Sequence, residues 1–355
     1  MKRVEVNPEL LSWALIRCTK SQQILNKKFP KLESWLKGEV SPTFKQLETF
    51  AKATYTPIGY FFLPEPPEEK SPISDLRSIK NQQFSRLSAN LLDTIYSMQH
   101  RQDWLREELT DCKADTLDFV GSARLHDDPQ VIGQEMRQVV NVRDGWARKI
   151  NTWQEAVSYL RACIEDLGVI AVINGVVGNN PHRKLDVKEF RGFALPDHYA
   201  PLIFVNGADA KSAQMFTLAH ELAHIWLGSE GEGLSGFDGV FPGKDRVEQF
   251  CDQAAAEFLV PARQLEELWR REKADSMVFE KLARLFKVSP VVVGRRAMDL
   301  RLVARETFFN FYEAYTKKES RDVKKTKGGI FTTIRTHVSG RCLHFLFFVP
   351  LWKAG

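Results

Sequence analysis

Residues 215–228 read MFTLAHELAHIWLG, a stretch that is apolar on nearly every face of a helix. Gly228 supplies a C-terminal stop, so we predict a buried α-helix here. Inside it lies the H-E-x-x-H pattern, His220 to His224. Two histidines four residues apart share one helix face and can both reach a single zinc ion. Glu221 between them can accept a proton from a water at the metal and pass it to a leaving amine.

A third ligand is expected downstream, because H-E-x-x-H alone arises by chance and a lone buried histidine is more often a satisfied core residue. Glu248 and Asp252 form an E-x-x-x-D pair ahead of the apolar run 254–261. Glu248 can be the carboxylate ligand, while Asp252 can accept the ring N–H of a liganding histidine and fix its tautomer. Two histidines and one glutamate leave a coordination position open, as catalytic zinc sites do.

Strand-like runs precede this helix. Residues 168–173 and 201–205 are rich in β-branched residues and end at Asn-Gly pairs, and 190–195 is a weaker candidate between them. A strand at 192–195 or 202–205 could pair at the sheet edge with an extended substrate. The alternative is that both strands are internal and only support the helix.

The first 63 residues read as four or five short helices. Asn7 and Pro8 start a helix over 8–18, Pro30 opens one over 31–37, and Ser41-Pro42 opens a third with Phe44, Leu47, Phe50 and Ala51 on its apolar face. Pro57 begins one more turn that ends near Phe62. Ten Lys and Arg against five Glu make this segment the preferred site for a polyanion, although a solvated basic face is the simpler reading.

The remaining chain is mostly helical by its apolar period. Residues 64–70, PEPPEEK, read as a linker, and helices are predicted over 85–109 with Trp104 on the apolar face, over 130–140, over 152–167, and from about 210 to 315. A second helix-turn-helix-like stretch, residues 282–296, has Ser289 as cap and Pro290 as first helical residue. Packing against the catalytic helices is its favoured role, ahead of DNA reading.

Composition sets further limits. The five scattered cysteines include no C-x-x-C pair, which favours a reducing cytoplasm over a disulfide framework. The polar start lacks the apolar core of a secretory signal, and no run approaches 18 apolar residues, so no membrane partner is expected. The uncharged aromatic run 343–352 is too short to span a bilayer and is either docked in a groove or prone to aggregate.

From about residue 5 to 320 the sequence resembles the ImmA/IrrE metallopeptidases in the form that carries an N-terminal XRE-type helix-turn-helix. The motifs that carry the resemblance are 189–193 (EFRGF), 200–206 (APLIFVN), 216–224 (FTLAHELAH) and 248–261, together with 29–35, 38–39, 42–43 and 57–60 at the front. The resemblance implies a Zn²⁺ cofactor bound by His220, His224 and Glu248, with Glu221 as catalytic base. The C-terminal tail departs from the family's basic helical ending, which leaves its role open.

The fold expected is α+β, with an all-α helix-turn-helix domain followed by a mainly helical zincin-like metallopeptidase domain that holds a small β-sheet. We assign 1–66 to the helix-turn-helix, 67–150 to a linker and helical connection, 151–315 to the metallopeptidase and 316–355 to a basic, then apolar tail.

The resemblance also implies a protein substrate, either a helix-turn-helix repressor or an antitoxin or toxin encoded nearby. DNA would contact the N-terminal domain through Lys27, Lys28, Lys31, Ser34 and Lys37. That helix offers no Arg, Asn or Gln for a bidentate base contact, so the alternative for this domain is to bind protein or form a homodimer. Two rivals remain: a DNA-binding repressor or antitoxin that uses the peptidase fold as a scaffold, and a zinc enzyme for small peptides.

Overall fold

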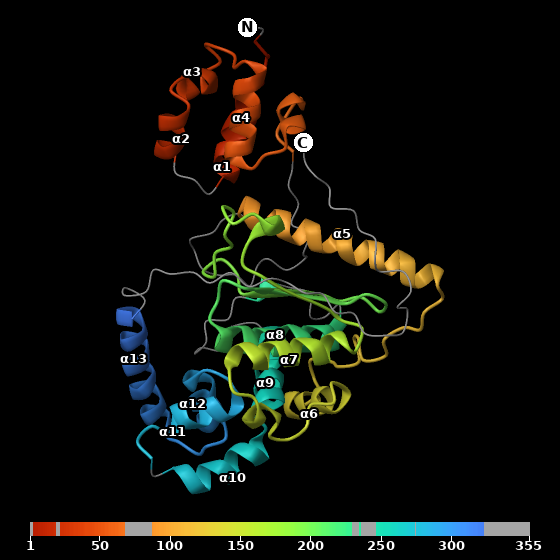
Figure 1. Ribbon diagram of the computed structural model, residues 1–355, viewed down its shortest axis with the longest axis vertical. Helices are drawn as coiled ribbons and strands as arrows, with labels where there is room; N and C mark the ends of the chain where they lie inside the picture. Colours follow the sequence, from red (N-terminus) through yellow and green to blue (C-terminus); the bar gives the residue numbers. More distant parts are fainter. Residues whose placement is uncertain are drawn as a thin grey trace. The chain divides into compact units, whose positions relative to one another are not determined.

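The computed structural model describes residues 3–18, 22–67, 87–228, 234–235, 246–273 and 275–322 (Figure 1). It divides into two compact units. The first contains the N-terminal helices, residues 81–97 and the segment Val176–Leu185; the second contains the rest of the chain. Among the described residues, no helix has the length and apolar character needed to cross a bilayer. The predicted C-terminal run 343–352 and residues 68–70 of the predicted linker lie outside the described residues.

The N-terminal helices are α1 (Pro8–Arg17), α2 (Gln22–Lys28), α3 (Leu32–Leu36) and α4 (Phe44–Thr54), followed by the short 3₁₀ helix η1 (Ile58–Phe62). The Asn7 side chain accepts a hydrogen bond from the Glu9 amide, which confirms the predicted start of α1. Phe50 lies at the centre of the small core, with its ring 5.5 Å from that of Phe29 and 5.8 Å from that of Phe61. The predicted all-α character of this region is confirmed.

The start of α4 differs from the prediction. Thr43, rather than Ser41, caps the helix in a capping box with Gln46. Because the helix begins at Phe44, that side chain falls in the first turn outside the core and is 54% exposed. Leu47, Phe50 and Ala51 occupy the buried face as expected.

The second unit is built on a four-stranded sheet with the order β1-β3-β2-β4. The strands are β1 (Ile170–Asn174), β2 (Gly192–Leu195), β3 (Leu202–Asn206) and β4 (Leu234–Ser235). β1 pairs with β3 in parallel, while β2 is antiparallel to both β3 and β4. β3 therefore lies inside the sheet and β2 has partners on both sides, so the alternative in which these two strands are internal is the one observed.

Helix α8 (Lys211–Leu227) packs against β2 and β3 and carries the H-E-x-x-H residues. Every residue from Gln214 to Leu227 is buried, and Gly228 ends the helix with a positive φ, as predicted. Residues 121–123 satisfy backbone carbonyls in the last turn of α8, since the amides of Gly121 and Ala123 donate to the carbonyls of Ile225 and Trp226. The C-terminal end of this buried helix is thus fixed by its own unit.

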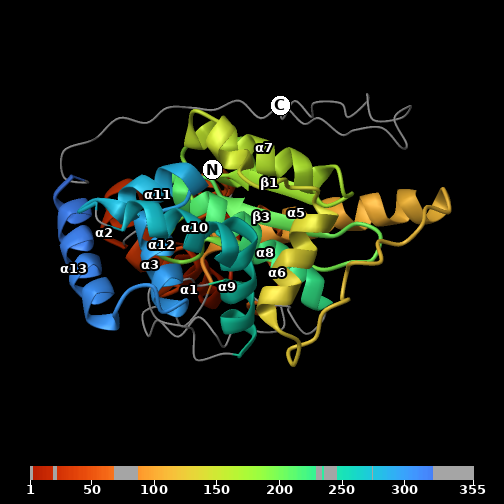
Figure 2. The same cartoon turned by 90° about the horizontal axis from the view of Figure 1, so that it is seen from below.

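The other helices of the described chain surround α8. They are α5 (Ala89–Asp111), which begins in the first unit and continues into the second, α6 (Pro129–Val139), α7 (Trp153–Glu165), α9 (Arg246–Leu259), α10 (Ala262–Glu272), α11 (Val278–Phe286), α12 (Pro290–Asp299) and α13 (Arg305–Asp322), with the 3₁₀ helices η3 (Trp146–Lys149) and η4 (Val177–Asn179). α7 and α9 both pack against α8, and α9 also packs closely against α6 (Figure 2). Ser289 caps α12 as predicted, with its hydroxyl oxygen accepting from the Val292 amide.

Trp104 on α5 is wrongly assigned to an apolar face, because its side chain is 52% exposed. Gln102 takes the inward position instead. Its amide group donates to the carbonyls of Leu195 and Ala200 at 2.8 and 2.9 Å, so a polar side chain satisfies two backbone acceptors at the end of the sheet.

Candidate metal centre

His220 and His224 lie on the same face of α8 and are essentially inaccessible to solvent. Their Nε2 atoms lie 3.1 Å apart. Four residues of helix bring the two rings together, and the packing of α8 under β2 and β3 keeps water from them. Two buried imidazole nitrogens this close need either a shared proton or a shared cation between them.

Helix α9 brings Glu248 to the same point. Its Oε2 lies 3.3 Å from Nε2 of His220, and its Oε1 lies 3.5 Å from Nε2 of His224. Glu248 is the first acidic residue of α9 and is partly shielded by α8. The structure therefore brings together the three residues that the sequence suggested as ligands, and each offers one donor atom within 4.8 Å of the others.

The spacing of these donors fits a tetrahedral ion. With metal–ligand distances of about 2.0–2.1 Å, neighbouring donors around a tetrahedral zinc are about 3.3–3.4 Å apart. The two Nε2 atoms are 3.1 Å apart, and the two oxygens of the Glu248 carboxylate lie 3.3 Å and 3.5 Å from one Nε2 each, so all three distances are close to that value. Two imidazoles and a carboxylate would occupy three corners and leave the fourth for a reacting molecule, and this donor set is typical of catalytic zinc.

Asp252 supports His220 from the opposite side of the ring, one helical turn after Glu248. Its Oδ1 lies 3.0 Å from Nδ1 of His220. This contact favours the tautomer that carries its proton on Nδ1, which leaves Nε2 as the donor toward a metal. Asp252 thus occupies the position that the sequence suggested for it.

The electrostatics of the cluster favour a positive charge. Burial by itself lowers the pKa of His220, but the hydrogen bonds and charges of Asp252 and Glu248 outweigh burial and hold that pKa well above 6.5. Burial raises the pKa of Glu248, yet the two imidazoles bring it below its usual value. A cation among these groups would meet a carboxylate already ionised at neutral pH.

Glu221 lies on α8 between the two histidines and is fully buried. Gly192 on β2 lies close to this carboxylate: a Cβ built there would lie only 2.6 Å from Oε1 of Glu221 and 2.6 Å from Cγ2 of Thr217. A glycine at this position is what lets the strand backbone approach the carboxylate so closely. β2 and α8 together therefore define where the Glu221 carboxylate lies.

The C-terminal half of α9 is held by a buried ion pair that sequence reasoning did not find. Glu257 and Arg296 form it, and both side chains are at most 3% exposed. Glu257 also accepts hydrogen bonds from Gln134 of α6 and from the Ala262 amide, both at 3.1 Å. One carboxylate thus ties α9 to α6, α10 and α12, and α9 is the helix that presents Glu248.

The residues proposed to contact DNA lie at the α2–α3 corner of the first unit. Lys27, Lys28, Lys31 and Lys37 are exposed, and Ser34 is half-buried. Trp35 is buried in the small core. These residues share a surface that solvent reaches, and their role stays a prediction.

Comparison with known proteins shows that the part of the chain around this site is similar to a family of metallopeptidases. Residues 182–298 match the model of the M78 peptidase family, described as the IrrE N-terminal-like domain. That range includes β2, β3, α8, α9 and the three donors, so the chain contains a metallopeptidase domain of this type, as the sequence suggested. The N-terminal helices match no helix-turn-helix family model.

A particular relative is the radiation response metalloprotease IrrE of Deinococcus deserti. It is 34% identical to this chain over 98 residues, which cover 26% of this chain and 34% of the relative. The chain thus spans about a third of the length of the curated relative it matches.

Proposed function

We propose that this protein is a zinc-dependent endopeptidase that cleaves a regulatory protein. The observation that carries the proposal is the convergence of His220, His224 and Glu248 on one point next to Glu221. The match of residues 182–298 to the M78 peptidases supports it independently. The donor set favours zinc, because nitrogen and carboxylate ligands in a tetrahedral arrangement suit that ion.

Each residue of the site has a distinct task in this proposal. When bound, zinc would act as a Lewis acid that polarises the scissile carbonyl and makes water more acidic. His220, His224 and Glu248 would hold it, and Asp252 would keep the His220 ring oriented. Glu221 would accept the proton of the attacking water on its carboxylate and return it to the amine that leaves, at a position that Gly192 and Thr217 define.

A polypeptide substrate fits the sheet. β4 is at the outer end of the strand order and pairs with Gly192 and Phe193 of β2. An extended substrate that adds to this end would pair with β4, which itself pairs with Gly192, the residue of β2 that approaches Glu221. We propose a repressor or antitoxin as that substrate, in the cytoplasm, where thiols such as Cys18 and Cys251 stay reduced.

The experiment is cleavage of regulators encoded beside this gene by the purified, zinc-loaded full chain. We expect one specific cut that a chelator abolishes and zinc restores. Glu221→Gln should keep the metal and lose cleavage. Cleavage that persists in this variant, or in the presence of chelator, would contradict the proposed base and cofactor.

We propose in addition that the first unit binds DNA through the exposed lysines of the α2–α3 corner. If the chain were a repressor or antitoxin with the peptidase fold as scaffold, promoter binding in a gel-shift assay would be insensitive to chelator and no partner would be cut. Cleavage of a partner would exclude that alternative.

A further inference from the structure

The first compact unit contains a hairpin that comes from the middle of the sequence. Val176–Leu185 follows β1 and precedes β2 in the chain, yet it is grouped with the N-terminal helices and the start of α5. A β-bridge between Val176 and Lys184 closes the hairpin. Inside it, the amide of Val177 donates to the carbonyl of Arg183 at 2.9 Å.

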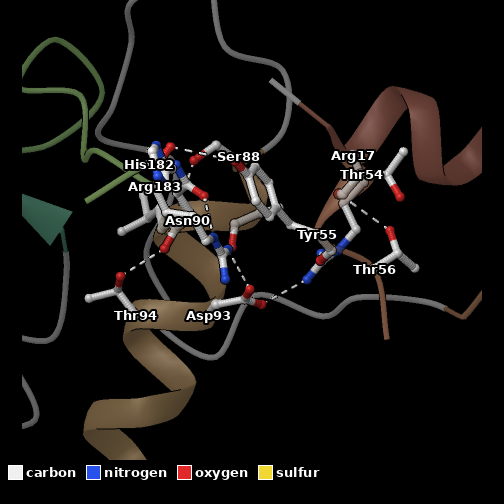
Figure 3. A network of polar contacts seen from close by, with 12 residues as sticks. Arg17, Thr54, Tyr55, Thr56, Ser88, Asn90, Asp93, Thr94, His182 and Arg183 are labelled. Atoms are coloured by element: carbon white, nitrogen blue, oxygen red, sulfur yellow. Dashed lines mark hydrogen bonds and ion pairs between the residues drawn. The ribbon is translucent and has the colours of Figure 1, made fainter. Parts of the chain in front are cut away.

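Asp93, on the first turns of α5, joins this hairpin to α1. Figure 3 shows its carboxylate between two arginines. Arg17 of α1 approaches Oδ1 at 2.9 Å, and Arg183 of the hairpin approaches Oδ2 at 2.6 Å. The side chains of Arg17 and Arg183 are 4% and 14% exposed, so each guanidinium depends on this carboxylate for charge compensation.

Tyr55 makes the same connection from the end of α4. Its carbonyl accepts a hydrogen bond from Arg17 at 2.7 Å, and its ring lies 4.5 Å from the guanidinium of Arg183 (Figure 3). The Tyr55 hydroxyl also donates to the carbonyl of His182 at 3.4 Å. Because Tyr55 has a left-handed backbone with φ of 55° where α4 ends, its carbonyl and ring are fixed by the way the helix terminates.

Asn90 completes the arrangement from α5. Its side-chain oxygen accepts from Nε of Arg183 at 3.0 Å, and its amide donates to the Lys184 carbonyl at 3.0 Å. Asn90 is buried. The hairpin is therefore held through both backbone and side chain, by residues of α1, α4 and α5.

We propose that Arg17, Tyr55, Asn90, Asp93 and Arg183 form a clamp that makes the N-terminal helices and the hairpin one cooperative element. The two ends of the hairpin continue along the chain into β1 and, through six residues, into Gly192 of β2. DNA bound at the exposed lysines of the N-terminal helices would thereby change how well ordered β2 is, and β2 is the strand that approaches Glu221. The regulatory consequence rests on the proposed peptidase function, whereas the coupling does not.

A hydrogen-exchange measurement on the zinc-supplemented full chain tests the coupling. Asp93→Asn keeps the shape of the side chain and removes the charge that both arginines share. We expect exchange in peptides covering 176–185 to become about tenfold faster, equivalent to about 1.4 kcal/mol. Peptides covering β2 should also exchange faster. Glu48→Gln is the matched control, because it removes an exposed carboxylate of α4 whose ion pair, with Lys52, lies on the surface.

A second variant perturbs the hairpin and measures the effect on the N-terminal helices. It keeps the proposal testable if Asp93→Asn fails to fold. Thermodynamic coupling is reciprocal, so Arg183→Gln in the hairpin should loosen the N-terminal helices. The Thr56 amide, which donates to the Ala51 carbonyl at 3.0 Å, reports this at the end of α4. Faster exchange at Thr56 supports the clamp.

Three outcomes overturn the proposal. In Asp93→Asn, residues 176–185 could exchange at the wild-type rate, or they could exchange faster while β2 keeps the wild-type rate. In Arg183→Gln, the Thr56 amide could exchange at the wild-type rate. None of these measurements needs turnover. A failed cleavage assay would therefore contradict the proposed function and leave the clamp intact, while an active enzyme with unaltered exchange would contradict only the clamp.

Discussion

Gly192→Ala offers a direct test of how the sheet positions Glu221, the carboxylate that we propose as the base. A Cβ at this position would lie 2.6 Å from Oε1 of Glu221, 2.6 Å from Cγ2 of Thr217 and 2.9 Å from the Phe204 carbonyl. Ordinary contacts of a Cβ begin at about 3.4 Å, so the Glu221 carboxylate would have to shift by about 0.8 Å. Since a misplacement of about 1 Å can cost about 100-fold in rate, we expect kcat/KM to fall by that order.

The same substitution should destabilise the fold by about 1–3 kcal/mol, the usual cost of overpacking a core. Adding Thr217→Ser removes Cγ2 and keeps the hydroxyl that donates to the Ala213 carbonyl. The double variant should recover part of the stability but little of the rate, because the contact with Glu221 remains. Gly59→Ala is the control for a glycine-to-alanine change, since a Cβ there meets nothing within 4 Å.

The assays are kcat/KM on the identified substrate, zinc content and chemical denaturation. Zinc content should stay at the wild-type level in Gly192→Ala, because the substitution touches none of the three ligands. If the variant is folded, loaded with metal and as fast as the wild type, then the close approach of β2 does not position Glu221 and the reasoning is refuted.

Three further predictions concern the support of the site and the N-terminal surface. Glu257→Ala leaves Arg296 buried without a carboxylate and should lower the free energy of unfolding by about 3–5 kcal/mol in a denaturant titration; a loss below 1 kcal/mol would show that the pair does not anchor α9. Asp252→Ala should weaken zinc binding by about 10- to 100-fold in competition with a chromogenic chelator, because the ring of His220 loses its orienting partner; an unchanged affinity would argue against that contact. Lys31→Gln should reduce the salt dependence of DNA binding by about 0.9 in log K per log salt, and an unaltered slope would exclude a phosphate contact at Lys31.

Much of the catalytic half could be predicted from local pattern. The apolar run around His220 allows only a buried helix, and a four-residue spacing on a helix places His224 beside it whatever surrounds them. The position of Glu248 is harder to predict, because its distance from the two histidines depends on how α9 packs against α8. Glu248 could be proposed as a ligand because it and Asp252 precede an apolar helical run, and because buried histidines need a group that compensates for their burial.

The errors in the fold arise where tertiary contacts override local pattern. Trp104 fits the apolar period of α5, yet Gln102 points inward because two carbonyls at the end of the sheet need a donor. Phe44 fits the period of α4, but the capping box of Thr43 starts the helix there and leaves the first turn exposed. In each case a hydrogen-bond requirement decided the outcome.

The ion pair of Glu257 with Arg296 and the clamp on Asp93 could not be predicted from one sequence. Their members are separated by about 40 to 90 positions, and nothing local distinguishes them from the charged residues that normally face solvent. Only the three-dimensional packing shows that they are buried and mutually dependent. The hairpin that contains Arg183 lies between β1 and β2 in the sequence, and Arg183 reaches Asp93 only through the fold.

The central claim is that three side chains converge on one divalent ion, and metal analysis of the purified full chain tests it most directly. After zinc is supplied and the excess removed, we predict one zinc per chain in the wild type and in Glu221→Gln. His224→Gln and Glu248→Gln should each fall well below that ratio while remaining folded. A wild type without stoichiometric zinc, or ligand variants that keep a full equivalent, would contradict the account.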